Sequence, residues 1–258
     1  MVMRVAVIMA VRNMGHSVDA AVNSILEQTY RELELLAVDD ASSDSSNEAL
    51  CQWKSRDSRV QVFTNPKNLG YPASLNLGWK NTDCSYIAIM DADDLAMSER
   101  IERQVDFLER NPDIAVVGSA VEFIDEQGNS LGIQARPTSH EELARRMYRE
   151  SPFFHPSVMM RREFLEGLSG YDERLRRCQD CDLWLRGYQR FRFANLSDIL
   201  VKYRVSPKVR WSSIGYGVFV LARAGWREGA WFKGPWYAGR FAASGTLVNL
   251  GLRPRLPS

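Results

Sequence analysis

Short apolar runs alternate with helical patterns along the first 110 residues. Residues 5–11 and 86–90 are entirely apolar, which is typical of strands buried on both faces of a parallel sheet. Two more strand-like runs lie at residues 33–38 and 60–63, and helical spacing of apolar residues predicts helices at residues 18–26, 48–54 and 73–79. This alternation predicts parallel βαβ units with right-handed crossovers.

The rhythm changes after residue 110, where longer strands and a hairpin are expected. The pattern predicts a helix at residues 98–110, a strand at 114–124 and a hairpin turn at 125–129. Further elements are expected at residues 139–148 (helix), 157–160 (strand), 161–165 (helical turn), 180–190 (helix), 191–194 and 199–203 (short strands). The predicted fold is α/β, with a mixed, mostly parallel sheet flanked by helices in a domain of residues 1–205.

The amino-acid composition is typical of a globular protein. The 258 residues are 45% apolar and 25% charged, with a net charge of +1, which argues against a nucleic-acid partner. No run of about 18 apolar residues predicts a spanning helix, and the first residues lack the pattern of an export signal. Four cysteines favour a reduced, cytoplasmic protein. The Cys178–Cys181 spacing lacks a second pair, so neither zinc nor redox work is expected there.

Residues 206–258, here called the C-terminal extension, differ from the rest of the chain. From Lys202 onward the sequence holds ten basic residues and one acid, Glu228, together with four of the seven tryptophans. Basic and aromatic residues at helical spacing suit a membrane surface that carries anionic lipid. The alternative is a helical subdomain whose aromatic side chains cover the sheet domain.

An acidic cluster directly follows the apolar run at residues 86–90. Asp91, Asp93 and Asp94 stand within four positions, at the strand end where open α/β sheets bind ligands. Hard oxygen ligands suit Mg²⁺ or Mn²⁺, which complete their coordination with substrate phosphates. The cluster therefore predicts a metal–diphosphate site, with a solvated acidic turn before a helix as the alternative.

Two other acidic sites carry candidate chemistry. Asp39 and Asp40 follow the run at residues 33–38, where a carboxylate can accept from a uracil N3–H or from ribose hydroxyls, or can simply cap the next helix. Asp180 lies in the first turn of the helix predicted at 180–190. The helix macrodipole favours acids there in any case.

The ordered set of motifs resembles the family 2 glycosyltransferases, which have the GT-A fold. The matching pieces span roughly residues 4 to 205 and include Asp39-Asp40-Ala-Ser42-Ser43-Asp44, Asn68-Leu-Gly70, Asp91-Ala-Asp93-Asp94, His155-Pro-Ser157, Gly170-Tyr171-Asp172-Glu173 and Gln179-Asp180-Cys-Asp182. Dinucleotide-binding enzymes share this fold class, but no Gly-x-Gly-x-x-Gly follows the first strand.

The resemblance implies a role for each matching residue. Residues 1–110 would bind a nucleotide-sugar, usually a UDP-sugar, and residues 111–205 the acceptor. Asp91 and Asp93 would form the DXD metal site for Mn²⁺ or Mg²⁺, and Asp180 would be the catalytic base. The implied nucleotide-sugar contacts are Ala10, Val11 and Asn13 in the nucleotide pocket, Asp39 and Asp40 at the uridine, Asn68, Gly70 and Asn76 at the floor and diphosphate side, and Asp91, Ala92, Asp94 and His155.

The implied reaction is an inverting transfer to a glycan or lipid-linked acceptor. The acceptor hydroxyl would attack the anomeric carbon in line, Asp180 would accept its proton, and the metal would neutralise charge on the departing diphosphate. The alternative is a non-catalytic nucleotide-sugar- or glycan-binding relative in a polysaccharide assembly. Peripheral attachment to the cytoplasmic membrane face is expected for the C-terminal extension.

Two departures from the family pattern bear on this hypothesis. Gln179 stands where many relatives have a glutamate, and Ser206 and Pro207 follow Tyr203-Arg204-Val205 where many carry a histidine. A third metal ligand from that loop is therefore not expected. Arg204, Lys208 or Arg210 is instead a candidate clamp for the diphosphate, since arginine suits phosphate oxygens. For His155, a structural role beside Pro156 is the alternative to a substrate contact.

Overall fold

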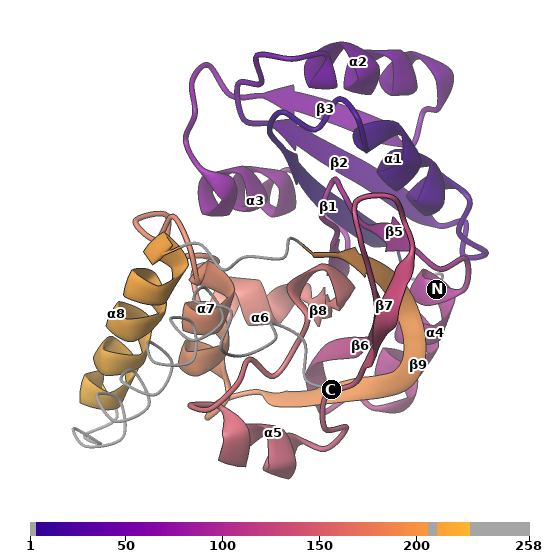
Figure 1. The fold of residues 1–258 in the computed structure, drawn as a ribbon. Coiled ribbons are helices and arrows are strands. Elements are labelled where there is room, and N and C mark those ends of the chain that lie inside the picture. Colours follow the sequence, from indigo (N-terminus) through magenta and orange to yellow (C-terminus); the bar gives the residue numbers. More distant parts are fainter. Residues whose placement is uncertain (1–3, 206–210, 228–258) are drawn as a thin grey trace.

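A computed structural model describes residues 4–205 and 211–227 of the chain. Within these residues, helices flank a curled nine-stranded sheet of order β3-β2-β1-β4-β8-β6-β9-β5, with β7 beside β6 (Figure 1). The strands are β1 (Val5–Val11), β2 (Leu33–Asp39), β3 (Val60–Thr64), β4 (Tyr86–Ile89), β5 (Leu95–Ala96), β6 (Ile114–Ile124), β7 (Ser130–Gln134), β8 (Met159–Arg161) and β9 (Arg192–Arg204).

The first half of the sheet is parallel, as the alternating pattern predicted. Strand β1 is buried along its whole length and pairs in parallel with β2 on one side and β4 on the other. Val11 lies opposite Asp39 of β2, and Ile8 lies opposite Ile89 of β4. The carboxyl ends of these three strands therefore share one edge of the sheet, which is the ligand-binding edge of such folds.

Helices cover both faces of the sheet because alternate residues of β1 point to opposite sides. Val5, Val7 and Met9 pack with the helices on one face, whereas Ala6 and Ile8 pack with those on the other. The first face carries α1 (Val18–Leu26), α2 (Ser46–Arg56) and α4 (Arg100–Arg110). The second carries α3 (Tyr71–Lys80), α5 (His140–Arg146), α6 (Arg162–Gly167) and α7 (Gln179–Gly187).

The second half of the sheet is mixed and differs from the sequence prediction at two strands. β8 pairs antiparallel with β4 and β6, and β9 runs parallel to β6. Instead of two short strands at 191–194 and 199–203, a single strand, β9, runs through the polar residues between them. It does so because register shifts opposite Ser119 and Ala120 take up these residues without ending the pairing. The two-residue strand β5 was not predicted.

The described part of the C-terminal extension is a helix, α8 (Trp211–Arg227), which lies beside α7 (Figure 1). Val220, Leu221 and Ala224 belong to the same buried cluster as Trp184 of α7, and Arg223 donates to Asp172 at 2.8 Å. For α8 these contacts favour the packing alternative. The remaining basic and aromatic residues, 206–210 and 228–258, lie outside the described residues.

Among the residues that the structure describes, no helix combines the length and the apolar character needed to cross a membrane.

Candidate active site

Three carboxylates meet in the loop that follows β4. Oxygen atoms of Asp91, Asp93 and Asp94 lie within 4.8 Å of one another. The backbone turns tightly here, with the Asp94 amide donating to the Asp91 carbonyl at 3.3 Å. Asp94 is fully buried, whereas Asp91 and Asp93 are half-buried and face the cavity described below. The three acids therefore form one cluster in space, and the metal site expected there stays a prediction.

Two arginines hold this acidic loop in place. Arg100 of α4 is fully buried and donates to the Ile89 carbonyl at 2.8 Å. Burial lowers the pKa of Arg100 to about 10, and the charges of Asp94 and Asp91 oppose that shift, so the guanidinium stays charged at neutral pH. Arg204 binds from the other side, because its backbone amide donates to Asp94 Oδ1 at 2.7 Å and its Nε to the Asp93 carbonyl at 2.9 Å.

The two arginines offset only part of the repulsion among the acids and of the cost of burying them. Burial, followed by the charge of Asp91, raises the pKa of Asp93 to about 6. Burial and the charges of Asp91 and Asp93 raise the pKa of Asp94 well above its usual range.

Asp94 also has an oxygen without a partner. Its Oδ2 atom is buried and makes no hydrogen bond with any residue that the structure describes. Three clustered carboxylates, one with an orphaned oxygen, form a donor set of hard oxygens that fits Mg²⁺ or Mn²⁺.

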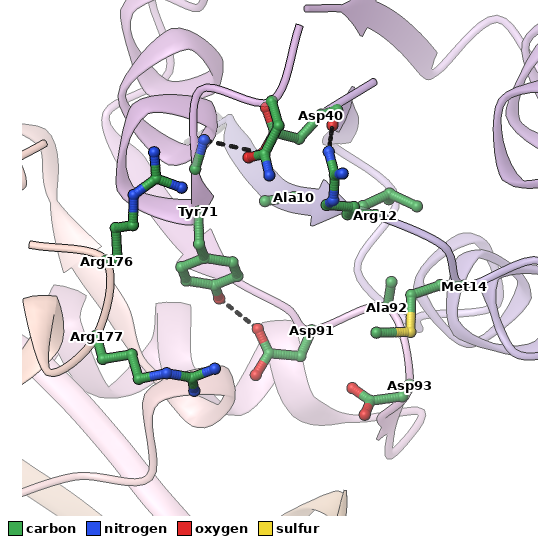
Figure 2. Close-up of a pocket in the computed structure, with 13 residues that line it drawn as sticks. Ala10, Arg12, Met14, Asp40, Tyr71, Asp91, Ala92, Asp93, Arg176 and Arg177 are labelled. Carbon is green, nitrogen blue, oxygen red and sulfur yellow. Dashed lines mark hydrogen bonds between the residues drawn. The ribbon is translucent and has the colours of Figure 1, made fainter. Parts of the chain in front are cut away.

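A cavity of ≈ 640 Å³ opens from the acidic loop toward the ends of β1 and β2 (Figure 2). Asp91 and Asp93 lie at one end of it, and Arg176 and Arg177 approach from the loop before α7 (Figure 2). Eight of the residues expected to contact a nucleotide-sugar or its metal line this cavity: Ala10, Val11, Asp40, Asn68, Gly70, Asp91, Ala92 and Asp93.

Asp39 and Asp40, at the end of β2, make hydrogen bonds within the protein. Asp40 accepts hydrogen bonds from the amides of Leu69 (2.7 Å) and Gly70 (2.9 Å), and it thereby fixes the turn that begins α3. Asp39 accepts from the Ser42 amide and from Asn47 Nδ2 at 3.2 Å, and it does not line the cavity. A uridine contact for either carboxylate stays a prediction.

Asn76 holds the chain together instead of lining the cavity. Its Nδ2 donates to the Tyr171 carbonyl and to Glu173, while its Oδ1 accepts from the Tyr171 amide and from Trp79 Nε1. Every polar atom of the side chain is therefore engaged. Asn76 therefore joins α3 to the loop before α7, whereas the sequence analysis expected it to contact the nucleotide-sugar.

Asn13 and Arg204 line a second cavity of ≈ 680 Å³, on the other side of Asp93. Asn13 has a φ of 54° and accepts from the Ser43 amide at 2.9 Å. The Arg204 guanidinium binds the carbonyls of Asp93 and Asp125. In this structure Arg204 organises the acidic loop, so it is not placed as the diphosphate clamp that the sequence suggested.

His155 lies beside the first cavity, between two tyrosines. His155, in the short helix η1 (His155–Ser157), contacts the phenols of Tyr71 and Tyr171 through its two ring nitrogens. Burial, then the charges of Asp180 and Asp91, raise the pKa of Tyr171. Asp180 is therefore near enough to Tyr171 and Tyr71 for its charge to act on both phenols, and its role as catalytic base stays a prediction.

Sequence reasoning missed several side chains at this site, namely Arg12, Tyr71, Arg100, Arg176 and Arg177. For Arg100 a signal existed, because it stands next to Ile101 on the apolar side of the helical pattern. The others sit in loops or at a helix start, where periodicity carries no information.

A parallel βαβ half with an acidic loop at its carboxyl edge is the architecture of a nucleotide-binding α/β protein. The chain belongs to the glycosyl transferase family 2, whose model matches residues 6–168. It is therefore a glycosyltransferase, as the motifs indicated.

Individual proteins agree with this membership. The chain is 37% identical over 205 residues to the putative glycosyltransferase EpsE of Bacillus subtilis, covering 78% of this chain and 73% of that one. It is 32% identical over 212 residues to the O-antigen biosynthesis glycosyltransferase WbnJ of Escherichia coli, covering 79% and 80%.

Solved structures confirm the GT-A fold. The Staphylococcus aureus TarS 1–349 complex with UDP superposes with a TM-score of 0.67 at 18% identity, covering 95% of this chain and 71% of that one. The mannosyltransferase PcManGT of Pyrobaculum calidifontis, in complex with GDP-Man and Mn²⁺, gives 0.66 at 18% identity, covering 98% and 76%.

The raised pKa of Asp93 predicts that the free energy of unfolding of the metal-free protein depends on pH. The folded state binds the Asp93 proton more tightly than the unfolded chain does, so the free energy of unfolding falls as pH rises from about 4 to about 6. Asp93→Asn removes that loss and is expected to be more stable than wild type at pH 8 by about 1–3 kcal/mol, but not at pH 4.

Urea unfolding in EDTA at both pH values measures this difference. Asp83→Asn, which changes an exposed carboxylate, is the control and should show no such pH dependence. An Asp93→Asn protein that is less stable than wild type at pH 8 contradicts the assigned cause.

Proposed function

We propose that the protein is an inverting, metal-assisted glycosyltransferase that moves a sugar from a UDP-sugar to a glycan or lipid-linked acceptor. One observation carries the proposal: Asp91 and Asp93 of the carboxylate cluster line the same cavity as three arginines, next to the ends of β1 and β2. A sugar nucleotide diphosphate needs both kinds of group, because its phosphates bind cations and its metal binds carboxylates.

The arginines supply the positive charge that phosphate oxygens require. Arg12 is held over the β1 end by the carbonyls of Asp40 (2.6 Å) and Ala41 (3.3 Å). Arg176 and Arg177 face it across the cavity (Figure 2). In this arrangement the nucleoside lies toward Asp40 and the diphosphate lies between the arginines and the acidic loop, with residues 1–110 forming the donor half.

Asp91 and Asp93 would hold Mn²⁺ or Mg²⁺, with Asp94 close behind them. When bound, the ion neutralises negative charge on the departing diphosphate. Asp180, at the start of α7, removes the proton from the acceptor hydroxyl as that oxygen bonds to the anomeric carbon and the bond to the diphosphate breaks. Attack from the face opposite the diphosphate inverts the anomeric centre, and residues 111–205 form the acceptor half.

The names of similar proteins support a nucleotide-sugar donor and a polysaccharide acceptor. TarS was solved with UDP and PcManGT with GDP-Man and Mn²⁺, and WbnJ is named for O-antigen biosynthesis. A polysaccharide or its lipid-linked precursor is accordingly the proposed acceptor.

Asp180→Asn separates catalysis from donor binding. The amide cannot accept the acceptor proton, so turnover is expected to fall by about 10²–10⁴-fold, while the affinity for UDP with Mn²⁺ stays within about twofold of wild type. Isothermal titration and release of UDP from a panel of UDP- and GDP-sugars measure the two quantities.

Two outcomes would overturn parts of this function. An unchanged rate in Asp180→Asn removes the assigned base. Failure of the wild type to bind UDP, with or without Mn²⁺, removes the proposed donor class altogether. Hydrolysis of any nucleotide-sugar by the wild type, in turn, excludes the alternative of a non-catalytic binding protein.

For location, we propose peripheral contact of the C-terminal extension with the inner face of the cytoplasmic membrane. Two large side chains of α8 remain exposed although the helix packs on α7: Phe219 is 54% and Trp226 is 80% exposed. Flotation with anionic vesicles is expected to carry the full chain, and to carry a Phe219→Ser/Trp226→Ser variant less. Equal flotation of both, or none of either, rules out a membrane role for these side chains.

A further inference from the structure

Three ring side chains connect the acidic loop with the loop that precedes α7. The Tyr71 hydroxyl donates to Asp91 Oδ1 (Figure 2). His155 Nδ1 lies 3.4 Å from the Tyr71 oxygen, and His155 Nε2 lies 2.9 Å from the Tyr171 oxygen. Tyr71, His155 and Tyr171, here called the ring chain, come from α3, from η1 and from the loop before α7, so tertiary contact alone brings them together.

Proton counting fixes the direction of each hydrogen bond in the ring chain. Tyr71 has one O–H, which it gives to Asp91, so its oxygen accepts from His155 Nδ1–H. In the neutral imidazole, Nε2 is then the acceptor, and Tyr171 donates to it. All three hydrogen bonds therefore point toward Asp91.

Both tyrosines can donate, because an ordinary phenol is protonated at neutral pH. Tyr171 is buried, and Tyr71 is half-buried at the wall of the cavity.

The surrounding fold fixes both ends of the ring chain. Asp40 holds the Leu69 and Gly70 amides directly before Tyr71. Asn76 binds the Tyr171 backbone on both sides, accepting from its amide at 3.0 Å and donating to its carbonyl at 2.9 Å. The preceding residue must be small there, because a Cβ on Gly170 would lie 2.5 Å from Asn76 Oδ1.

We propose that Tyr71, His155 and Tyr171 are positioning residues that fix the orientation of Asp91 for the divalent cation. With Oδ1 engaged by Tyr71, Asp91 presents Oδ2 to the ion as a single, oriented ligand atom. The inference rests on the proposed metal-assisted function, which it deepens. Hydrogen-bond partners of metal ligands commonly contribute 10–100-fold to metal affinity.

The direct test is the affinity for Mn²⁺ in the presence of saturating UDP, measured by electron paramagnetic resonance of free Mn²⁺. Tyr71→Phe removes the bond to Asp91 and is expected to weaken Mn²⁺ binding about tenfold. Tyr171 reaches Asp91 only through the hydrogen bonds of His155 and Tyr71, so Tyr171→Phe is expected to weaken Mn²⁺ binding by less. UDP affinity without metal should not change in Tyr171→Phe, because Tyr171 does not line the cavity.

Tyr86→Phe is the matched control. Its phenol contacts Glu109 and Arg161 at the opposite end of β4, so its loss should leave Mn²⁺ affinity unaltered even if the unfolding midpoint drops. If Tyr71→Phe and Tyr86→Phe bind Mn²⁺ like wild type, the proposal is wrong. If the wild type itself binds no Mn²⁺ with UDP, the proposed metal function fails instead.

A second measurement tests the ring chain without any metal. The chain has only three histidines, so long-range ¹H–¹⁵N correlation spectra can assign each ring. The proposal requires His155 to carry its proton on Nδ1 in the wild type, and to lose that preference in Tyr71→Phe. A wild-type His155 protonated on Nε2 alone would reverse the hydrogen bonds and overturn the ring chain.

Discussion

Repulsion among three clustered carboxylates is the constraint on which this site depends. Asp91, Asp93 and Asp94 meet at the end of a buried strand, where solvent screens their charges poorly. Arg100 offsets part of this repulsion from within the core, and Arg204 ties down the loop backbone from β9. The negative charge that remains is the physical basis of the proposed cation site. Because both arginines come from elements after the loop, the first half of the sheet cannot build the site alone.

Helix α3 links three parts of the fold around the cavity. Its start is fixed by Asp40 at the end of β2, its first residue, Tyr71, contacts Asp91, and Asn76 one turn later holds the loop that precedes α7. A change in any of these contacts therefore affects more than one part of the cavity wall. Through this one helix, residues far apart in sequence are held close together.

Sequence reasoning recovered the parallel half of the fold and the acidic cluster because both depend on local patterns. The run at 86–90 and the acids after it are readable from neighbouring residues alone. The partners of those acids are not, since Arg204 lies 110 residues beyond Asp94 in the chain. Asn76 and Arg204 were expected to contact the substrate, but in the structure they bind protein groups. These protein partners are also distant in sequence, so local patterns do not reveal them. Strand β9 was divided in two because a bulge and a turn look alike in sequence.

Anomalous diffraction from crystals of the full chain grown with UDP and Mn²⁺ tests the central claim most directly. We expect one manganese peak coordinated by Asp93 and by Asp91 Oδ2, with the diphosphate oxygens completing the coordination inside the arginine-lined cavity. A manganese ion bound elsewhere, or UDP bound outside that cavity, would contradict it.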